Sequence, residues 1–381
     1  MRKIKILHRA ALSLFFMLAS NGTQAKITLL KGNVKSEQGL GRFNVQMEGT
    51  LRPRVLDVMG GKDHGNYQRN GYDGGTRLRF HVNYLLDEDL TWVNFYQVVV
   101  DVPKTIGWRH HYAPGARNTG RRQLYSGLKS QRFGQLTYGQ QNSVYYRLIS
   151  GQINSLSGDL SAEPVRLGVD SNYDGSWRAR KSLMYENQFG RLGLFGSYLF
   201  EEHPLALKNH LRYVRHGGAA LGLKLKIMPK LTWSLAWDTT RASLRDVRRH
   251  QQKHVNQRLL GSSLSWQPGC WTVILTEGWY HHFIAMKTPS PQHYFANNAW
   301  GTSYFIGPRI PLHSSPVKAI MPYYFGAHLR EGAGHRHFRN ENGLAVAFYV
   351  GQSLRIDYQH IFRTAEDHPG DVNAIRVEYN F

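Results

Sequence analysis

The last five residues, Val377-Glu378-Tyr379-Asn380-Phe381, decide the fold class of this chain. Val377, Tyr379 and Phe381 share one face of an extended strand, and Glu378 and Asn380 share the other. A transmembrane β-strand needs this arrangement, with an apolar face toward lipid and a polar face toward a wet interior. Soluble β-sandwiches also end on amphipathic strands, so the fold prediction depends on whether the rest of the chain repeats the pattern.

The amino terminus predicts a secretory signal peptide at residues 1–25. Four basic residues precede an apolar stretch at 10–19, and residues 23–25 (Thr-Gln-Ala) form a cleavage site. The apolar stretch is too short to cross a bilayer as a helix, and the remaining chain has no run of about 18 apolar residues. We therefore expect a single mature domain, residues 26–381, that crosses a membrane only as β-strands.

Composition restricts the possible partners. Cys270 is the only cysteine, so the exported chain has no disulfide framework. The formal net charge is +22 at pH 7, and removing the four basic residues of the signal peptide leaves +18. No zinc-finger, helix-turn-helix or RNA-binding signature accompanies this charge, so we expect no nucleic acid partner. Lipopolysaccharide phosphates and anionic solutes are the expected partners of an exported basic protein.

Segments with alternating apolar and polar residues recur along the whole mature chain. Leu231 and Trp233, for example, flank Thr232. Sixteen such segments can be marked, most of them about as long as a tilted membrane-crossing strand. They are 42–55, 76–86, 89–101, 121–131, 134–146, 178–189, 191–201, 214–228, 230–243, 257–267, 270–283, 297–307, 317–329, 341–350, 353–363 and 370–381.

The connections between these segments alternate in length. Short ones lie at 87–88, 132–133, 190, 229, 268–269 and 351–352. Long ones lie at 56–75, 102–120, 147–177, 202–213, 244–256, 284–296, 330–340 and 364–369. The connection 308–316 is the exception, because it is long where a short turn is due. Tight periplasmic turns alternating with long outer loops are typical of an antiparallel transmembrane β-barrel, whereas a two-sheet sandwich gives no reason for them.

Several stretches resemble the general diffusion porins of Gram-negative outer membranes. Residues 127–129 (Gly-Leu-Lys), 133–140 (Phe-Gly-Gln-Leu-Thr-Tyr-Gly-Gln) and Tyr145 are similar to that family's fourth and fifth strands. Residues 76–80 (Thr-Arg-Leu-Arg-Phe), with 89–91 downstream, are similar to its second strand and following turn. The terminal Phe381 and Tyr379 resemble the carboxyl-terminal signal that the family's barrel-assembly machinery reads.

This resemblance, which extends over the mature chain, implies a sixteen-stranded, all-β barrel that assembles as a homotrimer in the outer membrane. It implies a water-filled channel for passive diffusion of ions and small hydrophilic solutes, with no cofactor. The implied partners are the lipid bilayer, lipopolysaccharide, the barrel-assembly machinery and further copies of the chain. In the family the third outer loop folds into the pore, and here the corresponding connection, 147–177, is the longest.

The resemblance also implies a constriction, in which arginines on the barrel wall face acidic groups on the inward loop. The wall arginines match Arg77, Arg122 and Arg178. Arg79 shares the strand phase of Arg77, and Arg180 shares that of Arg178, so both would extend the basic row. For each arginine, the alternative is an ordinary solvated charge.

The inward loop departs from the family pattern. The family's Pro-Glu-Phe-Gly-Gly segment would align near residues 156–158 (Leu-Ser-Gly), where neither Pro nor Glu is present. Asp159, Glu163 and Asp170 are the nearest acidic residues. Fewer carboxylates opposite retained arginines raise the potential in the lumen, so we predict a preference for anions. The alternative is a solute-specific channel for phosphorylated or acidic sugars.

A second basic region lies in the segment 241–258, where one acid, Asp246, accompanies six bases. These are Arg241, Arg245, Arg248, Arg249, Lys253 and Arg258. Near the outer leaflet they could pair with lipopolysaccharide phosphates, or they could simply be solvated.

Other chemistry receives no support from the sequence. Adjacent His281 and His282 face opposite sides of a strand, and His335 and His337 lack a third ligand, so we predict no metal site. No Gly-x-Ser-x-Gly elbow or phosphate loop occurs, and nothing places a nucleophile beside a base, so we predict no enzyme activity. A non-conducting adhesin is the third functional class to consider.

Overall fold

The computed structural model describes most of the chain beyond the expected signal peptide. The described residues are 26–36, 39–59, 66–154, 156, 172–207, 210–248, 250–283, 297–313, 316–332, 338–365 and 370–381. The predicted signal peptide therefore lies outside the described residues. Within them, no helix has both the length and the apolarity required to cross a membrane.

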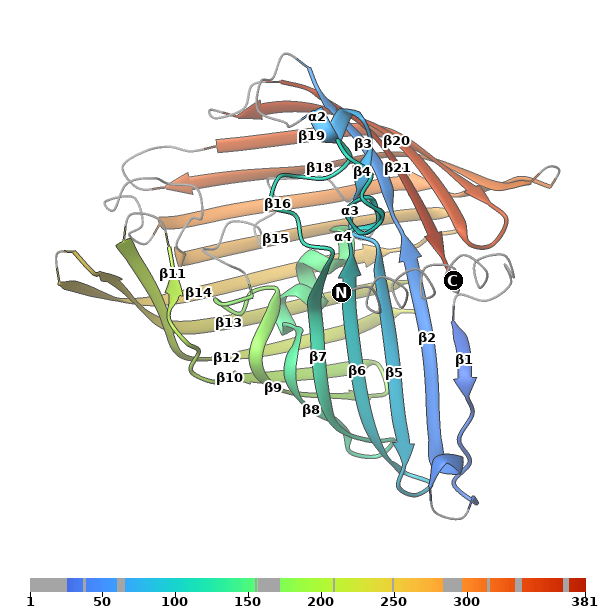
Figure 1. The fold of residues 1–381 in the computed structure, drawn as a ribbon, viewed down its shortest axis with the longest axis vertical. Coiled ribbons are helices and arrows are strands. Elements are labelled where there is room, and N and C mark those ends of the chain that lie inside the picture. The colour runs from blue at the N-terminus through green and yellow to red at the C-terminus, as the bar shows by residue number, and fades with distance from the viewer. Residues whose placement is uncertain are drawn as a thin grey trace.

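Sixteen antiparallel strands form a closed barrel, as the sequence predicted (Figure 1). The first barrel strand consists of two pieces, β2 (Phe43–Leu51) and β3 (Pro53–Val58). The others are β5 (Arg77–Leu85), β6 (Leu90–Val100), β7 (Thr119–Ser130), β8 (Gly134–Asn142), β9 (Arg178–Phe189), β10 (Leu192–Leu199), β12 (Leu211–Met228), β13 (Leu231–Asp246), β14 (Gln251–Trp266), β15 (Trp271–Phe283), β16 (Asn297–Pro308), β18 (Val317–Gly332), β19 (Phe338–Val350), β20 (Leu354–Ala365) and β21 (Val372–Asn380).

Further short elements lie before the first barrel strand or in the connections between strands. They are β1 (Ile27–Leu30), η1 (Leu40–Arg42), α2 (Asn66–Arg69), β4 (Tyr72–Asp73), α3 (Val102–Ile106), η2 (Tyr146–Ser150), α4 (Gly151–Asn154), β11 (Leu205–Ala206) and β17 (Ile310–Pro311). The unusually long short-side connection holds β17, which pairs with β18. The alternation of tight turns and long connections is thus present in the fold.

The barrel closes where the last strand meets the first. β21 pairs with β20 on one side and with β3 and the end of β2 on the other. At the seam, the Gly49 amide donates to the Phe381 carbonyl at 2.7 Å, and the Phe381 amide donates to the Gly49 carbonyl at 3.1 Å. The terminal aromatic residue that opened the sequence argument is therefore fixed in the closing ladder and is 3% exposed.

The outward face carries the apolar half of each strand. On β15, Trp271 and Trp279 are both 45% exposed and mark the two ends of the outward apolar stretch. Their separation is about 26 Å of strand at about 3.3 Å per residue, or about 20 Å across the membrane at a tilt of about 40°. Such a height is close to the apolar band of outer-membrane barrels, which is about 25 Å tall.

Strand boundaries differ from the predicted ones where the chain leaves the membrane or turns inward. β14 begins at Gln251 rather than at residue 257, because the sheet continues past the outer interface. β8 ends at Asn142 rather than at residue 146. Ser143 ends the strand, since its Oγ accepts a hydrogen bond from the Tyr146 amide at 3.0 Å and starts η2.

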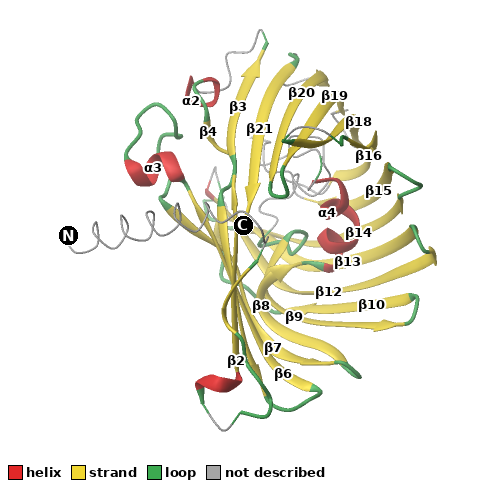
Figure 2. Cartoon of the chain, turned by 90° about the vertical axis from the view of Figure 1, so that its right-hand side faces the viewer, coloured by secondary structure: helices red, strands yellow, loops and turns green. Residues whose placement is uncertain are grey.

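The connection between β8 and β9 folds into the barrel, which confirms the predicted inward third loop. η2 and α4 lie inside the curve of the strands (Figure 2), and η2 contacts β12, β13, β14 and β15 across the lumen from its own strand. This crossing segment divides the interior, so it positions the candidate site.

Candidate pore constriction

Arginines gather on the inner wall beside the connection between β8 and β9, which we call the crossing loop. Arg77 and Arg79 point inward from β5, whereas Leu78 between them points out. Arg52 lies at the break between β2 and β3. Arg52, Arg79 and Arg122 are the nearest cationic neighbours of Arg77, so the four side chains form one electrostatic group.

Two of these arginines have carboxylate partners. Arg52 forms an ion pair with Glu378 of β21. Arg79 lies 3.5 Å from Glu48 of β2, which also faces His81. These pairs neutralise part of the wall and hold the two arginines against the seam.

Arg77 and Arg122 differ, since within the described residues neither forms an ion pair with a carboxylate. Their Nε atoms are buried and lack a hydrogen-bond partner. Arg122 lies at a bulge of β7, between the residues that pair with Gln97 and Val98, and its charged neighbours include Arg178. Arg77 is near enough to Glu378 to feel its charge, but Glu378 pairs directly with Arg52, so neither Arg77 nor Arg122 has a described carboxylate of its own.

Arg178 and Arg180 have different surroundings. Arg178 stacks on the Trp177 ring at 3.9 Å and neighbours Arg122. Arg180 instead lies 3.6 Å from Glu202 and stacks on Tyr173. The β8–β9 register shifts at this point, so the strict alternation that placed both arginines in one phase does not hold here. Of the five predicted arginines, the structure brings Arg77, Arg79, Arg122 and Arg178 together.

The crossing loop is anchored first on the far wall. Tyr145 OH and Tyr280 OH lie 2.7 Å apart, and Ser263 Oγ donates to the Leu148 carbonyl at 2.7 Å. The approach requires a glycine on β14, since a Cβ at Gly261 would lie 2.7 Å from the Tyr145 ring. Apolar packing and hydrogen bonds together hold η2 against this wall.

A buried ion network holds the chain at Leu156, two residues beyond α4. The Leu156 carbonyl accepts hydrogen bonds from Arg355 at 3.0 Å and from Arg376 at 2.8 Å. Both arginines also bind Asp357, at 2.6 Å and 3.1 Å, and Asp357 is 0% exposed. Buried charges are tolerated when they are paired and hydrogen-bonded, as they are here. We call Arg355, Asp357 and Arg376 the latch.

A third anchor fixes the chain where it returns to β9. Arg215 of β12 is fully buried and donates to the carbonyls of Tyr173 at 2.6 Å, Arg180 at 2.7 Å and Phe200 at 3.1 Å. Thr240 of β13 donates to the Asp174 carbonyl at 2.7 Å. The loop is thus held at its start, at Leu156 and at its return. The predicted acidic residues Asp159, Glu163 and Asp170 lie outside the described residues.

Arg52, Arg215 and the latch residues were not among the candidates from sequence. The inward phase of Arg355, Asp357 and Arg376 was readable from alternation, but their common contact with Leu156 is long-range. For metal chemistry, no group of three His, Cys, Asp or Glu side chains that could hold an ion is found in the described ranges, and His335 and His337 lie outside them.

A closed sixteen-stranded barrel with a loop anchored across its lumen defines an outer-membrane channel protein. The sequence of residues 10–267 matches the family described as Gram-negative porin. Because this match covers more than half of the chain, the chain belongs to the Gram-negative porins. Membership and fold indicate a channel rather than an enzyme. No curated protein sequence matches the chain.

Solved porin structures share the fold at low sequence identity. The chain is similar to OmpF of Salmonella typhi in complex with daunomycin, with a TM-score of 0.64 and 12% identity over 89% of this chain and 98% of that one. It is also similar to an anion-selective porin from Comamonas acidovorans, with a TM-score of 0.60 and 14% identity over 89% and 100%. The trimer form of OmpT from Vibrio cholerae gives 0.58 and 11% over 89% and 99%.

The latch generates a first prediction. Asp357→Asn leaves two buried guanidinium groups without their counter-charge, so we expect a loss of about 3–5 kcal/mol in the free energy of unfolding. We also expect frequent closures of the open channel, because the crossing loop loses its hold at Leu156. Urea titration of the folded barrel and single-channel recording measure the two effects.

Glu341→Gln is the matched control, since it removes another buried carboxylate, which pairs with Arg363 at 2.9 Å. It should lower the free energy of unfolding without increasing the frequency of channel closures. Equal closure frequencies in the two variants would contradict a specific role of the latch in holding the loop.

Proposed function

We propose that the protein is a porin for passive diffusion of ions and small hydrophilic solutes, with a preference for anions. The observation that carries the proposal is the charge of the wall group: among the residues that the structure describes, four clustered arginines (Arg52, Arg77, Arg79 and Arg122) stand against two carboxylates (Glu48 and Glu378). Excess positive charge in a narrow, partly low-dielectric passage concentrates anions and repels cations.

The charges of this wall persist at any physiological pH. Guanidinium groups titrate far above neutrality, so arginine is a fixed positive charge. Arg147 and Glu186 pair with one another and do not change the balance. A Comamonas porin of the same fold is described as anion-selective, so this fold is compatible with the proposed preference.

Neutralising Arg77 and Arg122 tests the anion preference. In Arg77→Gln/Arg122→Gln, we expect the chloride-to-potassium permeability ratio to fall roughly two- to tenfold. A unit charge about 10 Å from the ion contributes about 0.4 kcal/mol at the dielectric of water and about 1.7 kcal/mol at an effective dielectric of about 20. The reversal potential in a salt gradient across a planar bilayer gives the ratio.

The control is Arg132→Gln, which removes an exposed arginine from the turn between β7 and β8. It should leave the permeability ratio at the wild-type value. A clear cation preference of the wild-type channel would refute the proposal, whatever the variants do.

A solute-specific channel for phosphorylated or acidic sugars is the second candidate. It is favoured by the closeness of Arg77, Arg79 and Arg122, because converging guanidinium groups bind phosphate and carboxylate oxygens in bidentate geometry. A binding site of this kind predicts that glucose 6-phosphate blocks the chloride current with saturation, and that glucose does not. A current that stays linear in solute concentration would favour the general channel.

We also propose that three copies assemble, as in the trimer form of Vibrio OmpT. An apolar groove of about 540 Å³ lies on the outside of the closing seam, between α3 and the outward residues of β3 and β21. Ile106 and Trp108 at its edge are 54% and 57% exposed. Burying such side chains against a second copy would contribute about 1.5–3 kcal/mol each.

Ile106→Ala/Trp108→Ala should therefore convert trimers to monomers in native electrophoresis of detergent-solubilised protein. Trp271→Ala, on the short-turn side of β15, is the control and should leave the trimer intact. If both variants migrate as the wild type does, the groove is not the contact between copies.

Two further inferences concern biogenesis. We propose that residues 1–25 are removed on export and that the assembly machinery recognises Tyr379 and Phe381 before the barrel closes. The burial of Phe381 in the finished seam supports this order, because a recognised side chain has to be accessible at the time of recognition.

A further inference from the structure

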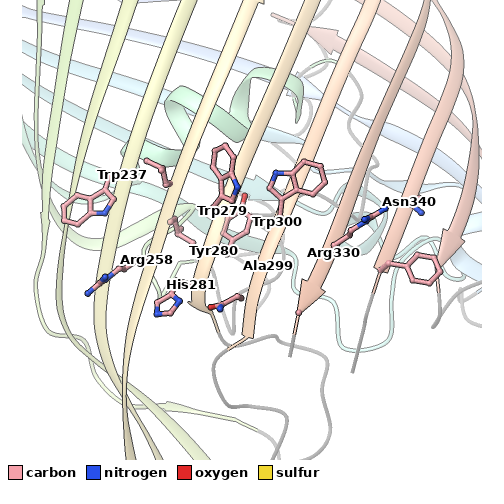
Figure 3. Close-up of a pocket in the computed structure, with 14 residues that line it drawn as sticks. Trp237, Arg258, Trp279, Tyr280, His281, Ala299, Trp300, Arg330 and Asn340 are labelled. Carbon is pink, nitrogen blue, oxygen red and sulfur yellow. The ribbon is translucent and has the colours of Figure 1, made fainter. Parts of the chain in front are cut away.

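Aromatic side chains lie on both faces of the barrel wall. Many point outward, as do Trp279 and Trp300 of the paired strands β15 and β16 (Figure 3), which are 45% and 37% exposed. Outward rings at the membrane interfaces are ordinary in outer-membrane barrels. His81, Phe95 and Tyr125 are different, because they lie on the inner face, where a porin wall meets water. These three rings need a separate account.

The inward direction of the three rings follows from strand pairing. His81 lies two residues after Arg79 on β5 and therefore shares its inward phase. Phe95 of β6 is paired with His81, and Tyr125 of β7 is paired with Phe95. Directly paired residues point to the same side of an antiparallel sheet, so the rings form one row across three strands. We call His81, Phe95 and Tyr125 the inner aromatic cluster.

The rings of the inner aromatic cluster contact one another. The His81 and Phe95 ring centroids are 4.9 Å apart in an edge-to-face arrangement, and those of Phe95 and Tyr125 are 5.1 Å apart and stacked. Phe95, in the middle, is 8% exposed, whereas His81 and Tyr125 are half-buried. The position paired with Tyr125 on β8 is Gly139, which has no side chain to cover the Tyr125 ring. The end of the row thus keeps aromatic surface accessible to the lumen.

The inner aromatic cluster lies next to the wall arginines, on their short-turn side. Arg79 and His81 are separated along β5 by about 6.6 Å at about 3.3 Å per residue, which is roughly the length of a benzoate ion. On the loop side, Arg147 pairs with Glu186, and both are charged neighbours of Tyr125. The cluster is therefore bordered by the arginine group and by the crossing loop, along the passage that this loop narrows.

Polar side chains around the cluster are bonded to one another. Gln123 donates a hydrogen bond to Gln97 at 2.9 Å and accepts one from the Asn142 amide at 3.0 Å. Thr137 donates to Gln141 at 2.7 Å. A hydroxyl-rich solute would have to compete with these bonds, whereas a flat apolar ring needs only the face or edge of another ring. The surroundings therefore favour an aromatic solute over a sugar.

We propose that the inner aromatic cluster and the wall arginines together form a binding site for aromatic carboxylates, such as benzoate, inside the pore. The carboxylate binds Arg122, which lies three residues from Tyr125 on β7, through charge-assisted hydrogen bonds. The ring stacks on Tyr125 and extends toward Phe95. This inference rests on the proposed anion-preferring channel and names the class of solute that such a channel would bind best.

Block of the chloride current through the purified channel in a planar bilayer tests the site at neutral pH. The probes are benzoate, cyclohexanecarboxylate and glucuronate. Cyclohexanecarboxylate has the charge and nearly the size of benzoate but no aromatic face. We expect a saturable block by benzoate, with a half-blocking concentration roughly three- to tenfold below those of cyclohexanecarboxylate and glucuronate.

Variants locate the ring of the solute. Tyr125→Leu should raise the half-blocking concentration of benzoate roughly three- to tenfold and leave that of cyclohexanecarboxylate unchanged, because leucine keeps the apolar surface and removes the ring. Phe95→Leu, the second variant of the cluster, should act in the same direction. Phe80→Leu is the matched control, since Phe80 lies on the outer face of β5, stacked with Tyr96 at 6.3 Å, and its benzoate block should equal that of the wild type.

Two measurements show that each variant is intact. Heat-modifiable mobility in electrophoresis reports the folded barrel, and it should match the wild type. The chloride-to-potassium permeability ratio in KCl alone reports the wall arginines, and it should also be unchanged, because none of these substitutions removes a charge.

Three outcomes would overturn the inference. Equal half-blocking concentrations of benzoate and cyclohexanecarboxylate in the wild type would mean that the aromatic ring contributes nothing. An unchanged benzoate block in both Tyr125→Leu and Phe95→Leu would place the ring elsewhere in the pore. A glucuronate block as strong as that of benzoate would favour a channel for acidic sugars. The reversal potential without organic solute decides the anion preference by itself, so failure of the inference and failure of the proposed function can be told apart.

Discussion

A hydrocarbon bilayer offers no partner to a backbone N–H or C=O group, and this constraint determines the shape of the chain. Each membrane-crossing strand must pair on both edges, so the sheet has to return to its first strand. The Gly49–Phe381 hydrogen bonds and the β21–β3 pairing achieve this return. Once the sheet is closed, the alternation of side chains gives a lipid-facing and a water-facing surface without further requirement.

The same constraint acts inside the barrel on the loop that crosses the lumen. An irregular segment there needs partners for its own carbonyl groups, and buried arginines supply them. Arg215 binds the Tyr173 and Arg180 carbonyls at the loop's return, and the latch arginines bind the Leu156 carbonyl. Asp357 offsets the charge that this solution buries. The fixed loop is therefore a consequence of hydrogen-bond satisfaction, and the positive wall faces a passage that the loop narrows.

Local alternation was sufficient to predict the strands from sequence, because a period of two directly reports a pleated strand with two environments. It failed at irregular points. The register shift between β8 and β9 separates Arg180 from Arg178, although strict alternation would place both on the same face of the strand. The latch could not be predicted, since Leu156 and Arg376 are 220 residues apart and meet only after closure. Arg77, Arg122 and Arg178 were identified through family resemblance and Arg79 through its strand phase, whereas Arg52 and the pairing with Glu48 and Glu378 required the structure.

Arginine has three environments in this protein, and the strand phase assigns them. Where the side chain points into the lumen, as at Arg77 and Arg122, it forms no ion pair with a described carboxylate, and its charge is available to passing ions. Where it points inward beneath the loop, as at Arg376, burial requires Asp357, and the charge serves the fold. Where it points outward near the long-loop end of the strands, as at Arg258, the charge lies opposite His281 and two residues beyond Leu260, outside the lumen. A change of one residue in register would exchange these roles. The hydrogen-bond ladder that closes the barrel thus also determines which of its many positive charges can act on solutes.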